Sequence, residues 1–265
     1  MSVWYGRETS VSLDENSLLW RYVGDRRFVM AICRAVSLQM LHPSIAAATH
    51  EFSMVQNRVY VHKRRTTPCI IRSAYEDDFD AVRRIRYSHD HFHGRRPDGR
   101  RYHALNPEVF LFEHATYVDA LFTCVDVFFD GLDPDDREQL YAETCEWYGR
   151  YGISTRTLPT TLSDFRDYFT EALATELDPE PGLGWYREQL LRPDYWYFRA
   201  LPTPAVRAIQ HPVAAGHLGL TPSRSDRRVL ATTASMLRTA DRVAPAHNIW
   251  PGEVRAKVLA ARRPS

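Results

Sequence analysis

Residues 76–94 read EDDFDAVRRIRYSHDHFHG, and the spacing of their apolar side chains predicts a helix with one buried face. The stripe on that face, at intervals of three and four residues, consists of Phe79, Val82, Ile85, His89 and Phe92. A histidine in this register faces the core, where an imidazole without a partner costs several kcal/mol. The stretch therefore predicts a buried polar site on an α-helix.

Helical geometry sorts the charged side chains of this stretch into two groups. At about 100° per residue, Arg86 and His93 lie within roughly 60° of His89, whereas His91 points to the opposite side. We therefore expect Arg86, His89 and His93 to face inward. An inward histidine is either a ligand for a metal or haem iron, or a core residue bonded to a backbone carbonyl.

Residues 106–131, NPEVFLFEHATYVDALFTCVDVFFDG, predict a second apolar helix with its own inward histidine. Asn106 and Pro107 are typical of a helix start. His114 falls in the apolar stripe, three residues after Leu111 and four before Val118. Two helices that are adjacent in the sequence thus each carry an inward imidazole, which indicates a shared ligand or cofactor between them.

The composition limits the classes of protein to which this chain can belong. It has 265 residues with a formal net charge of +1, which fits one compact unit, and 34 basic against 33 acidic residues give no field that attracts nucleic acid. The four cysteines are scattered, without the spacing of a zinc site or a disulfide framework. The N-terminus does not have the pattern of a signal peptide, and no apolar stretch approaches eighteen residues. We expect a cytoplasmic protein without a membrane span.

Helical patterns fill most of the remaining sequence. Apolar periodicity predicts a helix over residues 28–41 that ends before Pro43, and further helices begin after Asp133 and after Thr161 or Ser163. Residues 54–72 are basic and irregular, and they predict a loop over a site or a helix that breaks at Pro68. Because no run of alternating strands occurs, we expect an all-α fold in a single domain over residues 1–265.

Several blocks in consistent order carry a resemblance to a known family. They are LQMLHPSIAAATHEFS at 38–53, Arg86-x-x-His89 ending in Gly94, YHALNPEVFLFEHATYVDALF at 102–122, DPDDREQLYAE at 133–143, and LPTTLSDFRDYF at 158–169. Over about residues 20–220 the chain resembles the DUF2236 family, which includes the latex-clearing rubber oxygenases and the MpaB-type oxygenases. The resemblance implies a globin-like helical bundle that encloses one haem b.

The resemblance also assigns residues to the haem. It implies that His89 is the proximal iron ligand, that His114 lies near the haem, and that Arg65 and Thr66 shape the opposite face. His62 stands where rubber-cleaving members carry an arginine.

Arginines near the rim of a haem pocket can form charge-assisted hydrogen bonds with the haem propionates. We expect this role for Arg34 and Arg86, although a salt bridge from Arg86 to Asp80 or Glu113 is an equal alternative for Arg86.

Together with these residues, the resemblance implies a haem b-dependent oxygenase or oxidase that acts on an apolar or aromatic small molecule with dioxygen. One alternative is a non-haem metalloenzyme that holds its metal with His89, His93 and His114, since histidines four residues apart on a helix can chelate. Another is a haem sensor or carrier without turnover. The substrate and the reaction product are not fixed by these residues.

Overall fold

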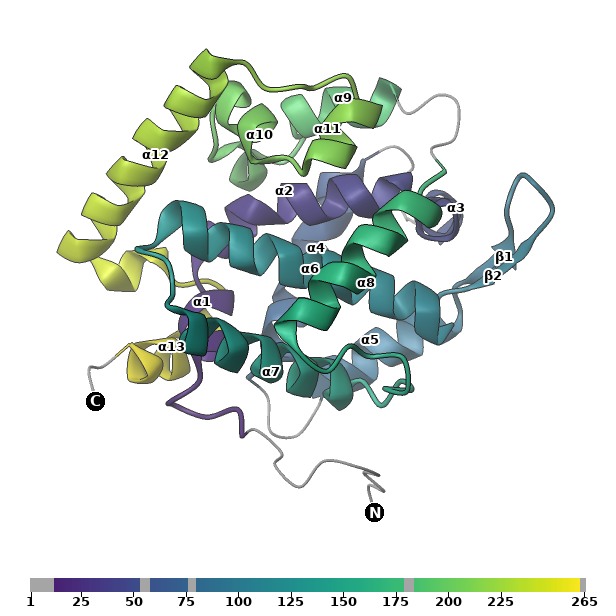
Figure 1. Cartoon of the computed structure of the whole chain (residues 1–265), viewed down its shortest axis with the longest axis horizontal. Coiled ribbons are helices and arrows are strands. Elements are labelled where there is room, and N and C mark those ends of the chain that lie inside the picture. The colour runs from purple at the N-terminus through teal and green to yellow at the C-terminus, as the bar shows by residue number, and fades with distance from the viewer. Residues whose placement is uncertain (1–11, 53–57, 76–79, 179–183, 263–265) are drawn as a thin grey trace.

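The fold is helical, as the sequence predicts. The structure is a computed structural model that describes residues 12–52, 58–75, 80–178 and 184–262, and these residues form thirteen α-helices and one short hairpin (Figure 1). The α-helices are α1 (Leu18–Val23), α2 (Arg26–Leu41), α3 (Pro43–Phe52), α4 (Val59–Arg72), α5 (Asp80–Asp90), α6 (Pro107–Phe128), α7 (Pro134–Arg150), α8 (Leu162–Thr175), α9 (Gly184–Leu191), α10 (Thr203–Ile209), α11 (Pro212–His217), α12 (Arg224–Val243) and α13 (Arg255–Ala261). Three 3₁₀ turns cover Trp196–Arg199, Pro245–Asn248 and Gly252–Val254.

The predicted helix starts are confirmed, because each has a side chain that satisfies the first free N–H groups. At α6 the Asn106 side chain accepts from the Glu108 N–H at 2.9 Å, and at α7 the Asp133 side chain accepts from the Asp136 N–H at 2.8 Å. Thr161, rather than Ser163, begins α8 and forms a capping box with the residue three positions later.

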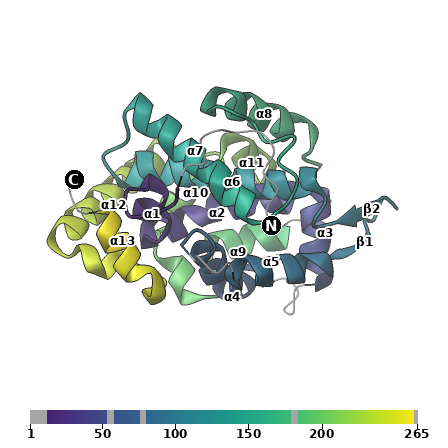
Figure 2. The same ribbon diagram turned by 90° about the horizontal axis from the view of Figure 1, so that it is seen from below.

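The core is built around α2 and α6, which pack along each other in the centre of Figure 1. Both helices are buried along most of their length. The buried apolar residues of the described chain form one cluster that extends from Leu13 to Ala261. In Figure 2, α4 and α5 lie side by side below this central pair. The two helices that carry most of the candidate site residues therefore pack against each other.

The break between α2 and α3 falls where the sequence predicts it. Helix α2 ends at Leu41, before Pro43, and α3 begins at Pro43. Among the described residues, no single helix is long and apolar enough to cross a membrane. The pair α2 and α3 meets that criterion together, across a bend of 100°.

Helix α4 differs from its prediction. Residues 59–72 form one continuous helix with Pro68 inside it, rather than a loop or a helix broken at the proline. Proline removes the hydrogen bond that its N–H would give to the carbonyl four residues before. The helix persists because one face is buried against the core, as tertiary packing commonly overrides propensity. That face consists of Val59, Tyr60, Lys63, Thr67 and Ile71.

Helix α5 is shorter than its prediction. It ends at Asp90, and His93 begins a strand, β1 (His93–Arg95), that pairs antiparallel with β2 (Arg101–His103). The turn between the strands contains Gly99 at φ +83°, a conformation that favours glycine. The hairpin projects from the helical body on the right of Figure 1. Phe79, predicted in the stripe, lies outside the described residues.

Candidate active site

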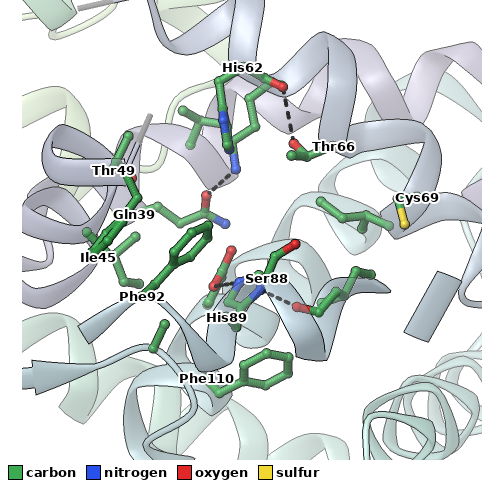
Figure 3. A pocket seen from close by; sticks show the side chains of 18 of the residues that line it. Gln39, Ile45, Thr49, His62, Thr66, Cys69, Ser88, His89, Phe92 and Phe110 are labelled. Atoms are coloured by element: carbon green, nitrogen blue, oxygen red, sulfur yellow. Dashed lines mark hydrogen bonds and ion pairs between the residues drawn. The ribbon is translucent and has the colours of Figure 1, made fainter. Parts of the chain in front are cut away.

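A cavity of about 380 Å³ is lined by residues of α2, α3, α4, α5 and α6. Figure 3 shows His62 and Thr66 on the wall formed by α4, and Ser88 and His89 on the opposite wall, with Phe92 and Phe110 beside His89. Its volume is within the range of small-molecule sites, and its lining is largely apolar with a few polar groups. The cavity therefore has the features of a ligand-binding site.

His89 reaches this cavity in a defined orientation. Its Nδ1 lies 2.8 Å from the Ile85 carbonyl oxygen, one turn earlier in α5. Because a carbonyl only accepts, Nδ1 carries a proton there, and Nε2 is the nitrogen available to a ligand. In the structure Nε2 lies 3.6 Å from a carboxylate oxygen of Glu113, an ion-pair distance that is longer than a hydrogen bond. The predicted inward position of His89 is confirmed.

His89 and Glu113 form a charged pair at the cavity wall. Burial alone lowers the pKa of His89, but the Glu113 carboxylate outweighs this effect and raises it. Burial likewise favours the neutral form of Glu113, but His89 and the more distant Lys63 ammonium lower its pKa to about 2. The Glu113 carboxylate therefore favours the protonated form of His89, and the two groups stabilise each other.

The predicted residues of the opposite face gather around the same cavity. His62, Arg65 and Thr66 all line it from α4, and the Thr66 hydroxyl donates to the His62 carbonyl at 3.5 Å. Burial, followed by the charge of Lys63, lowers the pKa of His62 to about 4, so this imidazole is neutral at pH 7. The structure thus places these side chains across the cavity from His89. Their part in catalysis stays a prediction.

Lys63 is a site residue that the sequence reasoning missed. It lines the cavity, only 8% of it is exposed, and its ammonium donates to Gln39 at 2.9 Å and to the Tyr117 hydroxyl at 3.0 Å. The available signal was its spacing, since Lys63 is four residues after Val59 and four before Thr67 on the buried face of α4. Gln39, Tyr117 and Glu113 join the site from α2 and α6 and were likewise not predicted as site residues.

Arg86 and Arg34 lie away from the cavity. Arg86 is exposed rather than part of the apolar stripe, and its guanidinium donates to the carbonyls of Tyr151 at 2.6 Å and Gly152 at 2.8 Å. The arginine side chain is long enough to reach these carbonyls at the end of α7. Arg34 instead binds Asp119 through two hydrogen bonds of 2.6 and 3.0 Å. Their predicted contacts with haem propionates stay predictions.

The prediction that His89 and His93 lie on the same face of one helix is wrong, because α5 ends at Asp90. His93 is exposed on β1, where its ring lies 5.9 Å from that of His103 on the neighbouring strand. Within the part of the chain that the structure describes, no three potential metal ligands of the histidine, cysteine or carboxylate type gather at one point.

His114 lies in the core, as predicted, and also lines the cavity. Its Nε2 donates to the Thr144 carbonyl at 3.1 Å, and its ring meets Trp147 and Tyr148 edge to face at 5.1 and 5.2 Å. Burial lowers the pKa of His114 to about 4, so the ring is neutral at pH 7. An inward histidine was expected either to bind a metal or haem iron or to bond a backbone carbonyl. His114 bonds a backbone carbonyl in the structure.

This neutral histidine makes stability depend on pH. The pKa of His114 is about 4 in the folded chain and 6.5 in the unfolded chain. Between these values the unfolded chain binds more protons than the folded chain. The free energy of unfolding therefore falls as the pH drops from about 6.5 toward 4. From pH 7 to pH 5 we expect His114 to contribute a loss of about 2 kcal/mol. In urea unfolding at both pH values, the His114→Gln variant should lose less stability on acidification than the original chain. An equal loss in both proteins would contradict this prediction.

The comparisons with known proteins point to one family. A family model described as "ER-bound oxygenase mpaB/B'/Rubber oxygenase, catalytic domain" matches residues 20–239. No curated protein and no solved structure matches the chain. The matched segment contains every helix that lines the cavity and extends the predicted family core into α12. The chain therefore belongs to the MpaB and rubber oxygenase family, DUF2236, whose members carry this oxygenase catalytic domain.

Proposed function

We propose that the protein is a haem b-dependent oxygenase or oxidase that acts on an apolar or aromatic small molecule, with His89 as the proximal iron ligand. The family supports oxygenase chemistry. The observation that carries the haem proposal is the orientation of His89, whose Nδ1 donates to the Ile85 carbonyl at 2.8 Å and leaves Nε2 toward the cavity. When one imidazole nitrogen binds a metal, the other usually donates its N–H to a carbonyl or carboxylate oxygen.

The donor set of the cavity fits a haem. An imidazole is a common axial ligand of haem iron, and the apolar lining beside it, which includes Phe92 and Phe110, suits a porphyrin face. When bound, the haem supplies the redox chemistry on dioxygen. Iron at Nε2 would take the place of a proton on this nitrogen, so His89 would then no longer form an ion pair with Glu113. The charge of Lys63 then stays near the carboxylate of Glu113.

The residues of α4 are proposed to act on the opposite side of the cavity. His62 is neutral and Thr66 carries a hydroxyl, so this wall offers hydrogen-bonding groups without a fixed charge at these two positions. Polarity and hydrogen-bond donors on the side away from the proximal ligand control how bound oxygen reacts. Arg65 is exposed and also lines the cavity, which supports a role for it in contact with a polar part of the substrate.

Oxygen uptake by the haem-loaded chain tests this proposal. We expect the purified protein to bind one haem per chain, with a Soret band, and to consume oxygen when an apolar or aromatic substrate is added. Haem binding without substrate-dependent oxygen consumption for any member of a broad panel would favour the sensor or carrier. Stoichiometric iron or zinc in a purified protein that does not bind porphyrin would favour the non-haem metalloenzyme.

A further inference from the structure

The cavity contains a buried ammonium group, Lys63, to which the oxygenase proposal assigns no ligand. Lys63 is 8% exposed, and two of its three N–H donors are met by Gln39 at 2.9 Å and by the Tyr117 hydroxyl at 3.0 Å. Among the described residues, no acceptor meets the third donor. Since Lys63 lines the cavity, this donor is available to a ligand there.

A chain of hydrogen bonds fixes the position of this ammonium. The Thr116 hydroxyl donates to the Glu113 carbonyl at 2.6 Å, so its oxygen accepts from the Gln39 amide nitrogen at 2.8 Å. Gln39 must then turn its carbonyl toward Lys63, and Figure 3 marks this bond. Because Gln39 and Thr116 are themselves buried, Lys63 is held in place before any ligand arrives.

Tyr117 provides a second donor beside the first. Its hydroxyl oxygen accepts from Lys63 at 3.0 Å, and its own proton has no acceptor among the residues that the structure describes. Tyr117 is 4% exposed and lines the same cavity. An ammonium N–H and a phenol O–H, 3.0 Å apart, therefore adjoin one space. Two neighbouring donors match the two oxygens of a carboxylate.

The charge of Lys63 lacks a direct counter-ion in the described part of the chain. Its two hydrogen-bond partners are a neutral amide and a neutral phenol, and no carboxylate lies within ion-pair distance of its nitrogen. The Glu113 carboxylate attracts this charge only from a longer distance. A buried charge without a close partner costs several kcal/mol, whereas a charge-assisted hydrogen bond to an anion offsets this cost. A single ammonium suits a group with one negative charge.

We propose that Lys63 and Tyr117 bind one carboxylate of a ligand whose remaining body lies against the apolar walls of the cavity. This inference rests on the proposed function and deepens it, because it names the substrate class as an apolar or aromatic carboxylic acid. A haem propionate offers the same chemistry from the cofactor. The experiment therefore compares these two sources of the carboxylate.

The test uses a matched pair of probes, 4-phenylbutyrate and 4-phenylbutanol, titrated calorimetrically into the full chain with and without haem. Loss of a charge-assisted hydrogen bond should weaken binding of the acid by the Lys63→Met variant about 10- to 100-fold, with the alcohol changed less than about 2-fold. Tyr117→Phe, which removes only the hydroxyl, should weaken the acid about 2- to 10-fold. Arg64→Met is the control, because Arg64 is exposed on the same helix and does not line the cavity.

Haem and its dimethyl ester identify the source of the carboxylate. If Lys63 binds a propionate, Lys63→Met weakens the binding of haem but not of the ester, and phenylbutyrate affinity is unchanged. Loss of phenylbutyrate affinity assigns the site to the substrate. The inference is overturned if both variants, folded by thermal unfolding, bind haem and phenylbutyrate as tightly as the original chain. A protein that does not bind haem would refute the proposed function. The titration of phenylbutyrate without haem would still test the carboxylate site.

Discussion

The His89→Ala variant is expected to lose stable haem binding, with at least about a 100-fold fall in affinity. Partners that only orient a metal ligand change affinity about 10- to 100-fold, so removal of the ligand itself should exceed this range. The His89 imidazole lines the cavity from α5. Its Nδ1 lies 2.8 Å from the Ile85 carbonyl oxygen, which fixes the orientation of the ring. The measurement is the Soret absorbance and the ratio of haem to protein after gel filtration.

His91 provides a matched control for this variant. His91 lies one residue after the end of α5, and its Nδ1 bonds the Tyr87 carbonyl, four residues earlier, at 2.7 Å, the same sequence spacing as in the bond of His89. Its side chain, however, is exposed and does not line the cavity. His91→Ala should therefore keep its haem. Added imidazole should restore the Soret band of His89→Gly, because it replaces the missing ring. An unchanged haem content and spectrum in His89→Ala would assign the iron to another ligand.

Local signals explain how much of the fold could be predicted. Helix α6 begins at Asn106 and Pro107, as expected, because a cap and a stripe of apolar residues are properties of adjacent residues. Helix α4 was mispredicted for the opposite reason. Its basic residues and Pro68 argue against a helix, and only burial against the core, which involves distant residues, stabilises it.

The same distinction applies to the site. The inward registers of His89 and His114 follow from helical periodicity, which local sequence contains. The partners of Lys63 come from 24 and 54 residues away, so its role depends on tertiary packing. Periodicity also does not mark where a helix ends, which is why His93 was placed with His89 although it lies on a hairpin.

A buried ion cluster at the start of α2 is expected to make a large contribution to the stability of the fold. Arg27 is 1% exposed, and its guanidinium contacts Asp25 at 2.8 Å and Asp241 at 2.6 Å. It also lies 3.5 Å from the centre of the Phe129 ring. These contacts join α2 to α12 and to the segment after α6. Arg27→Met removes one of the two guanidinium partners of the fully buried Asp25 carboxylate, the other being Arg262. We therefore expect the free energy of unfolding to fall by about 3 kcal/mol in urea titrations.

The Arg26→Met variant is the control that distinguishes the loss of stability in Arg27→Met from a general effect of removing a positive charge. Arg26 precedes Arg27 on the same helix but is exposed, so Arg26→Met should change stability by less than about 0.5 kcal/mol. Combining Arg27→Met with Asp25→Asn should recover part of the loss, because most of the cost comes from a buried carboxylate left with fewer partners, and asparagine also caps a helix well. A double variant no more stable than Arg27→Met alone would instead attribute the loss to packing of the arginine side chain, including its contact with Phe129.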